Sequence, residues 1–550
     1  MPSGGVPDGD GLRLTELVAS ISLATDLVTG QPMEHALRTC RLAVTVARSL
    51  GLDAGTVADV HFVALLRFLG CTADAPEMAR LAGGDNLGFM AAMAPVATGS
   101  AREEVRTLVR SAGRGLSPPR RAGLLAEALA SARAEVSHCE VGARLAARLG
   151  LGPGVVEALA HAYERWDGRG LPNGLSGAEI PVPVRVVVVA RDAVLWHRAA
   201  GPDAATDVLT RRRGRAYDPA AVDAVLAVGI PAPDEPAVWE EVLAGEPEPV
   251  RRVGSAGLDR AMAAVGDFTD LRSTWTRGRS SRLAATARAA GRACGLSGPE
   301  LATLTRAASV ADVGAVGVPS GIWQRPGPLG PAEVERVRLH PYLSERVLGR
   351  CAQLRPVAAL AGAHHERLDG SGYHRGSAAA QLPGPARLLA AADVWTALRE
   401  DRPHRPASTS AAVRDVLWRE AAEGRLDRTA VEAVLTVEGQ AAGRPRGARP
   451  AGLSEREVEV LRLIAHGCSN REVARRLGIS AKTVGHHVEH VYAKIGVTTR
   501  PAAALFAMEH DLLGGWGDHP MPSRRPRSHP RSTDPTGGRG SPWTSGRRAG

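Results

Sequence analysis

The chain has 550 residues, of which 44% are hydrophobic and 23% charged, with a formal net charge of +10, and this length predicts two to four domains. No apolar run reaches the ~18 residues that a membrane-spanning helix needs, and residues 1–11 lack the basic and apolar regions of a signal peptide. The six cysteines include no Cys-x-x-Cys pair, which argues against a disulfide framework or a zinc finger, so we expect a cytoplasmic protein without membrane contact.

Helical patterns dominate the chain from its first domain onward. The beginning is rich in Gly and Pro, and we expect a flexible N-terminus over 1–25. Apolar residues then recur every three or four positions in many segments, which predicts amphipathic helices. The run Val186–Val189 is typical of a strand by propensity, but its counterpart later in the chain, Leu388–Ala391, has a helical pattern. We predict a helix for both segments and an all-α fold for the protein.

The region before residue 440 contains an internal duplication. The sequence ERWDGRGL at 164–171 matches ERLDGSGY at 366–373. His138 and His340 each precede these matching segments by 26 residues. Shared residues at shared spacing indicate two homologous domains. The predicted units, called the first copy and the second copy below, are 26–235 and 255–440.

The two copies differ in length at one place. The interval from Arg67 to His138 is 71 residues, whereas the interval from Ala311 to His340 is 29. The first copy therefore carries an insertion of 42 residues, near 72–130.

The segment HHERLDGSGY at 364–373 resembles the signature of HD-GYP phosphohydrolases, all-α enzymes that hydrolyse cyclic di-GMP. The family pattern comprises an early His, a His-Asp pair, a Lys three residues after that Asp, a lone His, a His-His pair and a late Asp. These residues converge on two or three metal ions, which activate water for attack on phosphorus. The resemblance assigns five metal ligands to the second copy: Asp312, His340, His364, His365 and Asp393.

The second copy also departs from the family pattern. Arg279 stands at the early His, Ala311 at the His of the pair, and Ala315 at the Lys. Arg279 would bring a fixed positive charge to carboxylates that otherwise face a metal ion. We therefore expect at most one divalent transition metal, iron or manganese, with Asp312 as the candidate catalytic residue. The sequence leaves open whether such a site hydrolyses a substrate or only binds a ligand.

The first copy has lost more of the pattern. It retains His35 and His138, which we interpret as structural because two isolated histidines make a poor metal site. The other ligand positions hold different residues, namely Arg67, Phe68, Ala162, Tyr163 and Arg191.

The C-terminal part of the chain predicts three short helices in succession, each with its own start signal. Ser454, Ser469 and Ser480 are favourable N-cap residues. Glu457 and Glu472 complete capping boxes at the first two helices. A tight Gly-Ile turn separates the second helix from the third. This arrangement is typical of a helix-turn-helix that places one helix in the major groove of DNA.

Residues 453–510 resemble the DNA-binding domain of LuxR/FixJ-type regulators. The positions that match the family pattern are Leu453, Arg456, Glu457, Val460, Leu461, Gly467, Asn470, Ala474, Leu477, Ser480, Thr483, Val484, His487, Lys494, Gly496 and Arg500. Gly485 and His486 depart from it, because many members carry a basic residue after Thr-Val. The resemblance implies a four-helix domain at 449–514 that binds double-stranded DNA as a homodimer.

Seven residues are expected to contact DNA. They are Asn470, Ser480, Lys482, Thr483, His486, His487 and Lys494. Lys482 is the strongest candidate, because only two of the 68 basic residues are lysines and both lie on or beside the reading helix. The following tail, 515–550, is rich in Pro, Gly, Ser and Arg, and we expect it to be disordered.

Two functions fit these patterns. The leading hypothesis is a sequence-specific transcription regulator whose degenerate HD-GYP-like domains sense a ligand or dimerise. The alternative is a metal-dependent phosphodiesterase that hydrolyses a cyclic dinucleotide such as cyclic di-GMP. The missing ligands favour a protein that is not an enzyme.

Overall fold

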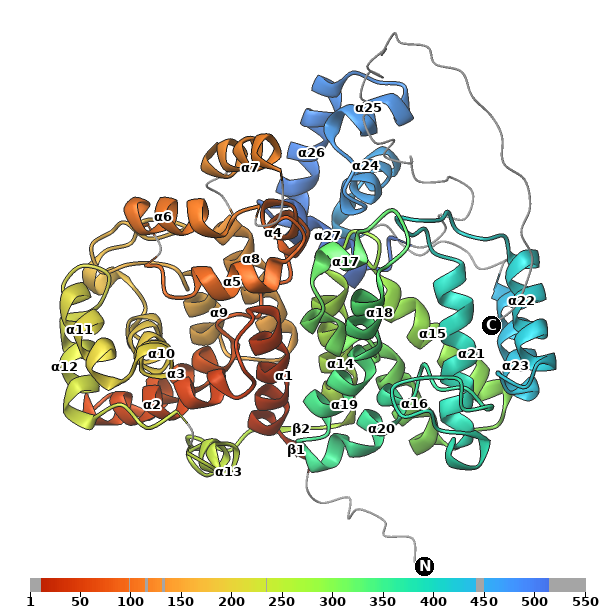
Figure 1. Ribbon diagram of the computed structural model, residues 1–550, viewed down its shortest axis with the longest axis horizontal. Helices are drawn as coiled ribbons and strands as arrows, with labels where there is room; N and C mark the ends of the chain where they lie inside the picture. The colour runs from red at the N-terminus through yellow and green to blue at the C-terminus, as the bar shows by residue number, and fades with distance from the viewer. Residues whose placement is uncertain are drawn as a thin grey trace, which may run out of the picture.

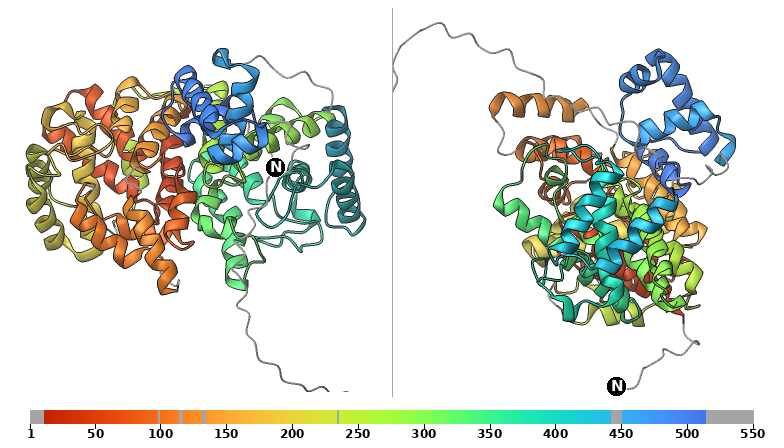
Figure 2. Two further views of the ribbon diagram at one scale, coloured as in Figure 1. Left: turned by 90° about the horizontal axis from the view of Figure 1, so that it is seen from above. Right: turned by 90° about the vertical axis from the view of Figure 1, so that its right-hand side faces the viewer.

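The computed structural model describes residues 11–97, 99–113, 117–130, 134–233, 235–441 and 450–513. Within these ranges the chain is helical, apart from the antiparallel pair of β1 (Leu12–Arg13) and β2 (Arg252–Val253). This confirms the all-α fold class. Two helical bundles lie side by side, and a small helical domain sits above their junction (Figure 1, Figure 2). The expected disordered tail at 515–550 lies outside the described residues.

The first copy forms the bundle drawn in red, orange and yellow (Figure 1). Its helices are α1 (Leu14–Val28), α2 (His35–Ser49), α3 (Ala54–Leu66), α8 (Ala134–Arg148), α9 (Pro153–Ala160), α10 (Val182–Ala200), α11 (Pro202–Arg212), α12 (Pro219–Val228) and α13 (Val238–Ala244), with the short η1 (Gly177–Glu179). The strand-like run of valines lies in α10, so the prediction of a helix there is confirmed. Val186, Val187 and Val189 are almost completely buried, and this packing overrides their preference for a strand.

The prediction of a flexible N-terminus over 1–25 is wrong for its second half. Residues 14–28 form α1, and Leu17 and Val18 have no exposed surface. This helix packs against α2 and α3 on one side and against η2 (Val313–Gly317) and α19 (His340–Leu348) of the second copy on the other. Apart from Glu16 and Asp26, its side chains are apolar or small, as is typical of a helix buried on most sides. Residues 1–10 lie outside the described part of the chain.

The insertion in the first copy is a small helical unit. It contains α4 (Ala75–Leu81), α5 (Asn86–Met93), α6 (Ala101–Ser111) and α7 (Pro118–Ala130). Its own core is built on Ala82, Phe89 and Ala112. The insertion also contacts the second copy, where the Ser320 amide donates to Asn86 Oδ1 at 2.7 Å.

The second copy forms the bundle drawn in green and teal (Figure 1). Its helices are α14 (Ser255–Asp270), α15 (Arg279–Ala293), α16 (Gly298–Val310), η2, α17 (Ser320–Trp323), α18 (Pro331–Arg338), α19, η3 (Ala352–Leu354), α20 (Arg355–Gly362), η4 (Ala379–Gln381), α21 (Gly384–Leu398), α22 (Ser410–Ala422) and α23 (Arg428–Ala441). The helix prediction at 388–391 is confirmed by α21.

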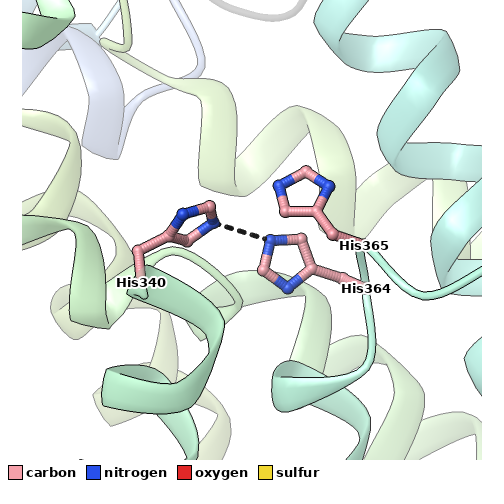
Figure 3. Close-up of side chains that lie close together, drawn as sticks. All are labelled: His340, His364 and His365. Carbon is pink, nitrogen blue, oxygen red and sulfur yellow. Dashed lines mark hydrogen bonds between the residues drawn. The ribbon is translucent and has the colours of Figure 1, made fainter. Parts of the chain in front are cut away.

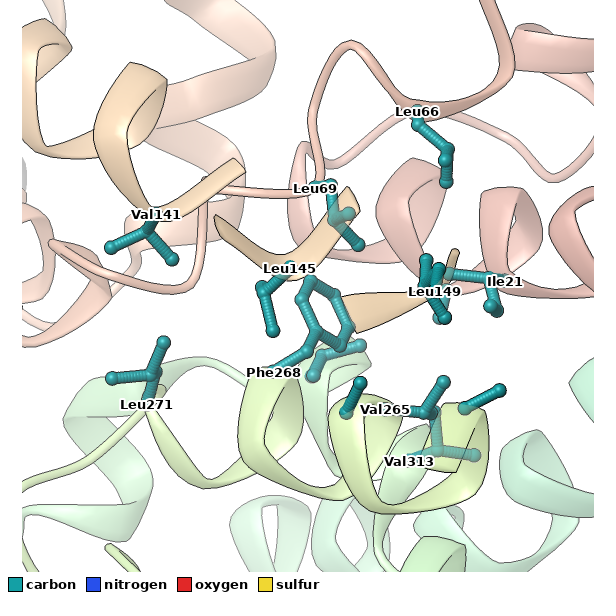
Figure 4. Close-up of a cluster of buried hydrophobic side chains, with 14 of the residues drawn as sticks. Ile21, Leu66, Leu69, Val141, Leu145, Leu149, Val265, Phe268, Leu271 and Val313 are labelled. Atoms are coloured by element: carbon teal, nitrogen blue, oxygen red, sulfur yellow. The ribbon is translucent and has the colours of Figure 1, made fainter. Parts of the chain in front are cut away.

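One apolar core continues from the first copy into the second. Leu145 of α8 and Leu149, which directly follows this helix, lie opposite Val265 and Phe268 of α14, and Ile21 of α1 lies at the same junction (Figure 4). Phe268 has no exposed surface, so the contact between the copies is as well packed as a domain interior. The two bundles therefore form one structural body.

The small domain contains η5 (Pro450–Gly452), α24 (Glu455–Ala465), α25 (Asn470–Leu477), α26 (Ala481–Ile495) and α27 (Arg500–Glu509). Both capping boxes and the Ser480 N-cap are present as predicted. Helix α27 is buried from Ala502 to Met508, because it packs against α24 on one side and against α8 and α14 on the other. The domain is thus docked on both copies.

Among the described residues, no helix combines the length and the apolar character required to cross a bilayer.

Candidate functional site

A close backbone contact positions the ligand residues of the second copy. A Cβ atom at Gly314 would overlap the backbone oxygen of His340, so only glycine allows this approach of η2 to α19. Ser344 Oγ accepts a hydrogen bond from the Gly314 amide at 2.9 Å and donates to the Ala311 carbonyl at 2.7 Å. These contacts hold Asp312, at the end of α16, against the first turn of α19.

Three predicted ligands, His340, His364 and His365, meet at one point (Figure 3). One ring nitrogen from each lies within 4.8 Å of the others. Nδ1 of His340 lies 2.6 Å from the Val337 carbonyl oxygen, and Nδ1 of His364 lies 2.6 Å from that of Ala361. Because a carbonyl oxygen only accepts hydrogen bonds, both Nδ1 atoms must carry a proton.

The other ring nitrogens of His340 and His364 therefore face each other with lone pairs. The two Nε2 atoms are 3.1 Å apart, and Asp312 Oδ1 lies 3.3 Å from the first and 3.6 Å from the second. Two lone pairs at this distance require a proton or a cation between them. Two imidazole nitrogens that share a metal at ~2.1 Å lie roughly 3.0–3.4 Å apart, so these donors fit one metal ion.

The surroundings shift the pKa values of the two imidazoles in opposite directions. Burial opposes charge on His364, but its hydrogen bond to Asp312 and the charge of Asp393 outweigh burial and raise the pKa of the imidazole. Burial lowers the pKa of His340. The pKa of the buried Asp312 carboxyl lies well below its ordinary value, because burial is outweighed by Arg279 and the two histidines.

Arg279 occupies the carboxylate side of the site. Its guanidinium donates to Asp312 Oδ2 at 2.8 Å, to Asp393 Oδ1, and to Glu400 Oε2 at 3.1 Å. All four side chains are at most 9% exposed. The predicted positive charge beside the carboxylates is therefore present, and it leaves these oxygens no need of a second metal ion.

Glu400 was missed by the sequence analysis, because no family motif includes it. It follows Asp393 by seven residues, which is about two turns of a helix and places both residues on one face of α21 and its continuation. The sequence signal that could have identified Glu400 is its spacing from Asp393, together with the arginine that stands at the early His position of the same copy.

Aromatic side chains form the remaining wall of the site. The Tyr373 ring lies 4.8 Å from the ring of His365, and the Trp323 ring lies 5.9 Å from that of His340. Arg272 lies above Trp323, with its guanidinium carbon 5.2 Å from the ring centre. The sequence analysis had assigned no role to Trp323 or Arg272, since their spacing matches no family position.

The corresponding place in the first copy has a different composition. His138 Nε2 lies 3.3 Å from Asp74 Oδ2, and His35 Nδ1 lies 3.4 Å from an Arg198 nitrogen. Neither histidine belongs to a group of three metal-ligating side chains among the described residues. Arginine, aromatic and alanine side chains stand at the remaining positions.

The predicted DNA contacts lie on α26 and its flanks. Lys482, Thr483 and His486 are exposed, and His487 is half-buried. Ser480 Oγ accepts a hydrogen bond from the Thr483 amide at 3.0 Å, so this serine also serves as the N-cap of α26. The first turns of α26 lie away from the two bundles (Figure 1).

Two further predicted DNA contacts, Lys494 and Asn470, are tied to other helices of the domain. Lys494 Nζ lies 2.7 Å from Glu457 Oε2, which ties the end of α26 to the start of α24. Asn470 Oδ1 accepts a hydrogen bond from Arg500 at 2.6 Å. These bonds give both residues a structural role, and their contact with DNA stays a prediction.

Comparison with known families gives two matches. The family described as "HD domain" matches residues 91–221 and 264–430, together more than half of the chain. The family described as "Bacterial regulatory proteins, luxR family" matches residues 451–507. These matches confirm the duplicated HD-type region and the LuxR-type helix-turn-helix domain.

Relatives with assigned activities match different parts of the chain. The "3'3'-cGAMP-specific phosphodiesterase 3" of Vibrio cholerae is 28% identical over 408 residues, which cover 72% of this chain and 88% of the relative. The "Cyclic di-GMP phosphodiesterase response regulator RpfG" of Xanthomonas campestris is 36% identical over 26% of this chain and 38% of its own length. The "Oxygen regulatory protein NreC" of Staphylococcus aureus is 43% identical over 61 residues, 11% of this chain and 28% of its own.

One solved structure shares the fold of the two bundles. It is a crystal structure of a cyclic GMP-AMP specific phosphodiesterase of V. cholerae (V-cGAP3), with a TM-score of 0.56 and 23% sequence identity. The match covers 78% of this chain and 98% of that chain.

Proposed function

The chain belongs to the HD domain family, and we propose that it is a DNA-binding transcription regulator whose second copy binds a cyclic dinucleotide without hydrolysing it. The ligand class follows from the printed activities of relatives, which act on 3'3'-cGAMP or cyclic di-GMP. The observation that carries the proposal is the bonding of Arg279 to three buried carboxylates.

The chemistry of Arg279 explains why the site would bind rather than hydrolyse. Two-metal hydrolysis uses one cation for the attacking oxygen and one for the leaving oxygen. A guanidinium neutralises carboxylates but cannot lower the pKa of a water molecule as a metal does. The carboxylates of the second copy are already neutralised, so we expect weak or no turnover.

His340, His364, His365 and Asp312 would hold one divalent metal. When bound, such a metal supplies a Lewis acid for a phosphate oxygen. The Val337 carbonyl keeps the Nε2 of His340 free of a proton, and a carbonyl one turn before His364 does the same there. These backbone bonds orient the imidazoles before any ligand arrives.

The segment between α14 and α15 would transmit a change at this site to the DNA-binding domain. In this segment, the guanidinium of Arg277 donates a hydrogen bond to the carbonyl oxygen of Ala465, at the end of α24. The next amide, Gly278, lies 3.2 Å from the sulfur of Met508 in α27. Arg279 follows directly and enters the site. A ligand that displaces Arg279 would therefore favour a different docking of the domain.

DNA binding is tested with the full chain, by fluorescence anisotropy on mixed-sequence duplexes at about 50 mM salt, with and without cyclic di-GMP. We expect Lys482→Ala to weaken binding by about 5- to 100-fold through the loss of one phosphate or base contact. Arg213→Ala, an exposed residue of the first copy, is the control. Absence of duplex binding under both conditions would refute the proposal.

Metal binding is tested by elemental analysis of the purified protein. We expect about one transition metal per chain, lost in His364→Ala, because removal of one imidazole opens the ligand set. His404→Ala, which changes an exposed histidine of the same copy, should retain the metal. Equal metal content in the wild type and in His364→Ala would contradict the assignment of these residues as metal ligands.

A phosphodiesterase is the second candidate, favoured by the persistence of Asp312 beside three imidazoles. It predicts release of linear dinucleotide from cyclic di-GMP or 3'3'-cGAMP, and loss of that release in Asp312→Asn. If the protein hydrolyses the dinucleotide and Asp312→Asn abolishes this activity, the second copy is an enzyme and not a ligand sensor. DNA binding would still be judged by the Lys482 variant.

A further inference from the structure

The two copies differ in the charged residues at corresponding positions of their sites. The second copy places Arg279 among Asp312, Asp393 and Glu400, and Glu400 pairs in addition with Arg282 and Arg402. By the spacing of the repeat, the first copy has His35, Phe68, Arg191 and Arg198 at these positions. Arg67 adds a further positive charge at the position of Ala311. No carboxylate stands at these five positions of the first copy, whereas three of them are arginines.

Arg67 is a buried cation without a carboxylate partner. Its residue is 8% exposed, and its side chain donates to the Ala162 carbonyl oxygen. Its Nε has no hydrogen-bond partner, and no ion pair joins Arg67 to an acid among the described residues. Burial and the nearby charge of Arg191 lower the pKa of the Arg67 guanidinium. A buried charge left unpaired is costly, and an anion would relieve that cost.

Arg191 brings a second guanidinium to the same place. The guanidinium carbons of Arg67 and Arg191 lie 5.8 Å and 5.6 Å from the centre of the Phe68 ring. Arg191 pairs with Asp192, but that carboxylate also accepts from Arg212 at 3.1 Å and from the Tyr217 hydroxyl. Asp192 is thus shared between two arginines and leaves the local charge positive.

His35 lies beside these arginines and does not change the local charge. Burial and the charges of Arg191 and Arg198 hold the pKa of His35 well below its ordinary value, so the imidazole is neutral. Its Nε2 has no hydrogen-bond partner. A neutral imidazole with an unbonded nitrogen beside guanidinium groups can complete an anion site by donating a proton in a hydrogen bond.

We propose that the first copy is a binding site for a phosphate group, held between Arg67 and Arg191. Guanidinium groups suit this ligand because their planar donors match phosphate oxygens in pairs. Phe68 and Tyr163 are partly exposed beside them, with the Tyr163 ring centre 5.0 Å from the guanidinium carbon of Arg67. These rings would stack on a base, which favours a nucleotide as the source of the phosphate.

The insertion is placed to respond to this ligand. Arg191 donates to the Ala94 carbonyl oxygen at 2.6 Å, and Arg212 donates to that of Pro95 at 2.8 Å and to Glu103 at 2.7 Å. The segment between α5 and α6 is therefore bonded to the arginines of the site. A phosphate that draws Arg191 away would loosen this segment.

The test is titration calorimetry of the full chain carrying His364→Ala, which removes one proposed metal ligand from the second copy, and every variant of the first copy is compared in this same background. The probes are inorganic phosphate and cyclic di-GMP. Arg67→Gln should weaken the binding of whichever probe binds by at least tenfold, because the variant lacks one of the two guanidinium groups proposed to hold the phosphate. Arg213→Gln, which changes an exposed arginine paired with Asp223, should leave the affinity unchanged.

The two probes distinguish the sources of the phosphate. Binding of cyclic di-GMP at least ten times tighter than that of phosphate supports a nucleotide, and equal binding supports free phosphate. No binding of either probe, or equal binding to wild type and Arg67→Gln, would overturn the site. Neither result bears on DNA binding or metal content, so the proposed function is judged separately.

A folding control accompanies the calorimetry. Because Arg67 lacks an ion pair, Arg67→Gln should unfold at the wild-type temperature or above it without ligand. The ligand should raise the unfolding temperature of the wild type and not that of the variant. A ligand-induced rise of the same size in both proteins would contradict the proposal.

Discussion

The two copies keep the same backbone contact but differ in the charged residues at corresponding positions of their sites. Gly314 lies against His340 in the second copy, and Gly70 lies against His138 in the first. In both places a Cβ atom would overlap the backbone oxygen of the histidine. The helical frame thus depends on close backbone approach and burial, not on the ligands. That independence allowed one site to keep its imidazoles while the other acquired arginines.

The largest expected effect contrasts one arginine from each copy. Arg279→Gln leaves the buried Asp312 and Asp393 without their shared cation, while Glu400 keeps Arg282 and Arg402, and we expect a loss of about 3–5 kcal/mol in the free energy of unfolding. Arg67→Gln removes an unpaired cation and should cost less than about 1 kcal/mol. Urea unfolding followed by circular dichroism measures both. Similar losses in the two variants would break the contrast between the sites.

A smaller effect tests the shared backbone frame. Gly314→Ala should push η2 away from α19, and Gly70→Ala should push residue 70 away from α8. For each variant we expect a loss of about 1–3 kcal/mol in the free energy of unfolding. Gly298→Ala is the matched control, because a Cβ atom there meets nothing within 4 Å. The measurement is thermal unfolding of the three variants. If either Gly70→Ala or Gly314→Ala leaves the unfolding temperature unchanged, the two copies do not both depend on this close backbone contact.

The smallest effect concerns the pH dependence of the first copy. Burial lowers the pKa of His138 to about 4, below the ~6.5 of an unfolded chain. A lowered pKa means that the unfolded chain binds the proton first, so stability is complete above pH ~6.5 and falls as the pH drops towards 4.

At pH 5 this histidine should cost about 2 kcal/mol of stability. His138→Gln should reduce the difference in unfolding free energy between pH 7 and pH 5 by that amount. The measurement is urea unfolding at both pH values. An unchanged pH dependence in the variant would mean that His138 titrates normally in the folded protein.

Local sequence signals were sufficient for the helix-turn-helix domain. Its helix starts depend on Ser454, Ser469 and Ser480, whose side chains bond to amides three residues later. Such contacts lie within one turn of the chain, so they are visible as a pattern of residues. The duplication was equally visible, because homologous domains preserve spacing.

Contacts between distant segments could not be obtained from those patterns. The N-terminal helix was taken for a flexible segment, because the partner that covers its second face belongs to the other copy. Glu400 joined the site only through Arg279, which precedes it by 121 residues. The docking of α27 against α8 and α14 was hidden for the same reason.

The sequence by itself determined the all-α class, the duplication and the helix-turn-helix, and it singled out the three histidines that meet in the second copy, because each depends on residue types at short or repeated spacing. Only the tertiary structure decided which charges meet. It joined Arg279 to three carboxylates and left Arg67 without one, and it bonded Arg277 to the DNA-binding domain. The free energy of a buried charge depends on its neighbours in space, and those neighbours are set by the packing of helices far apart in the chain.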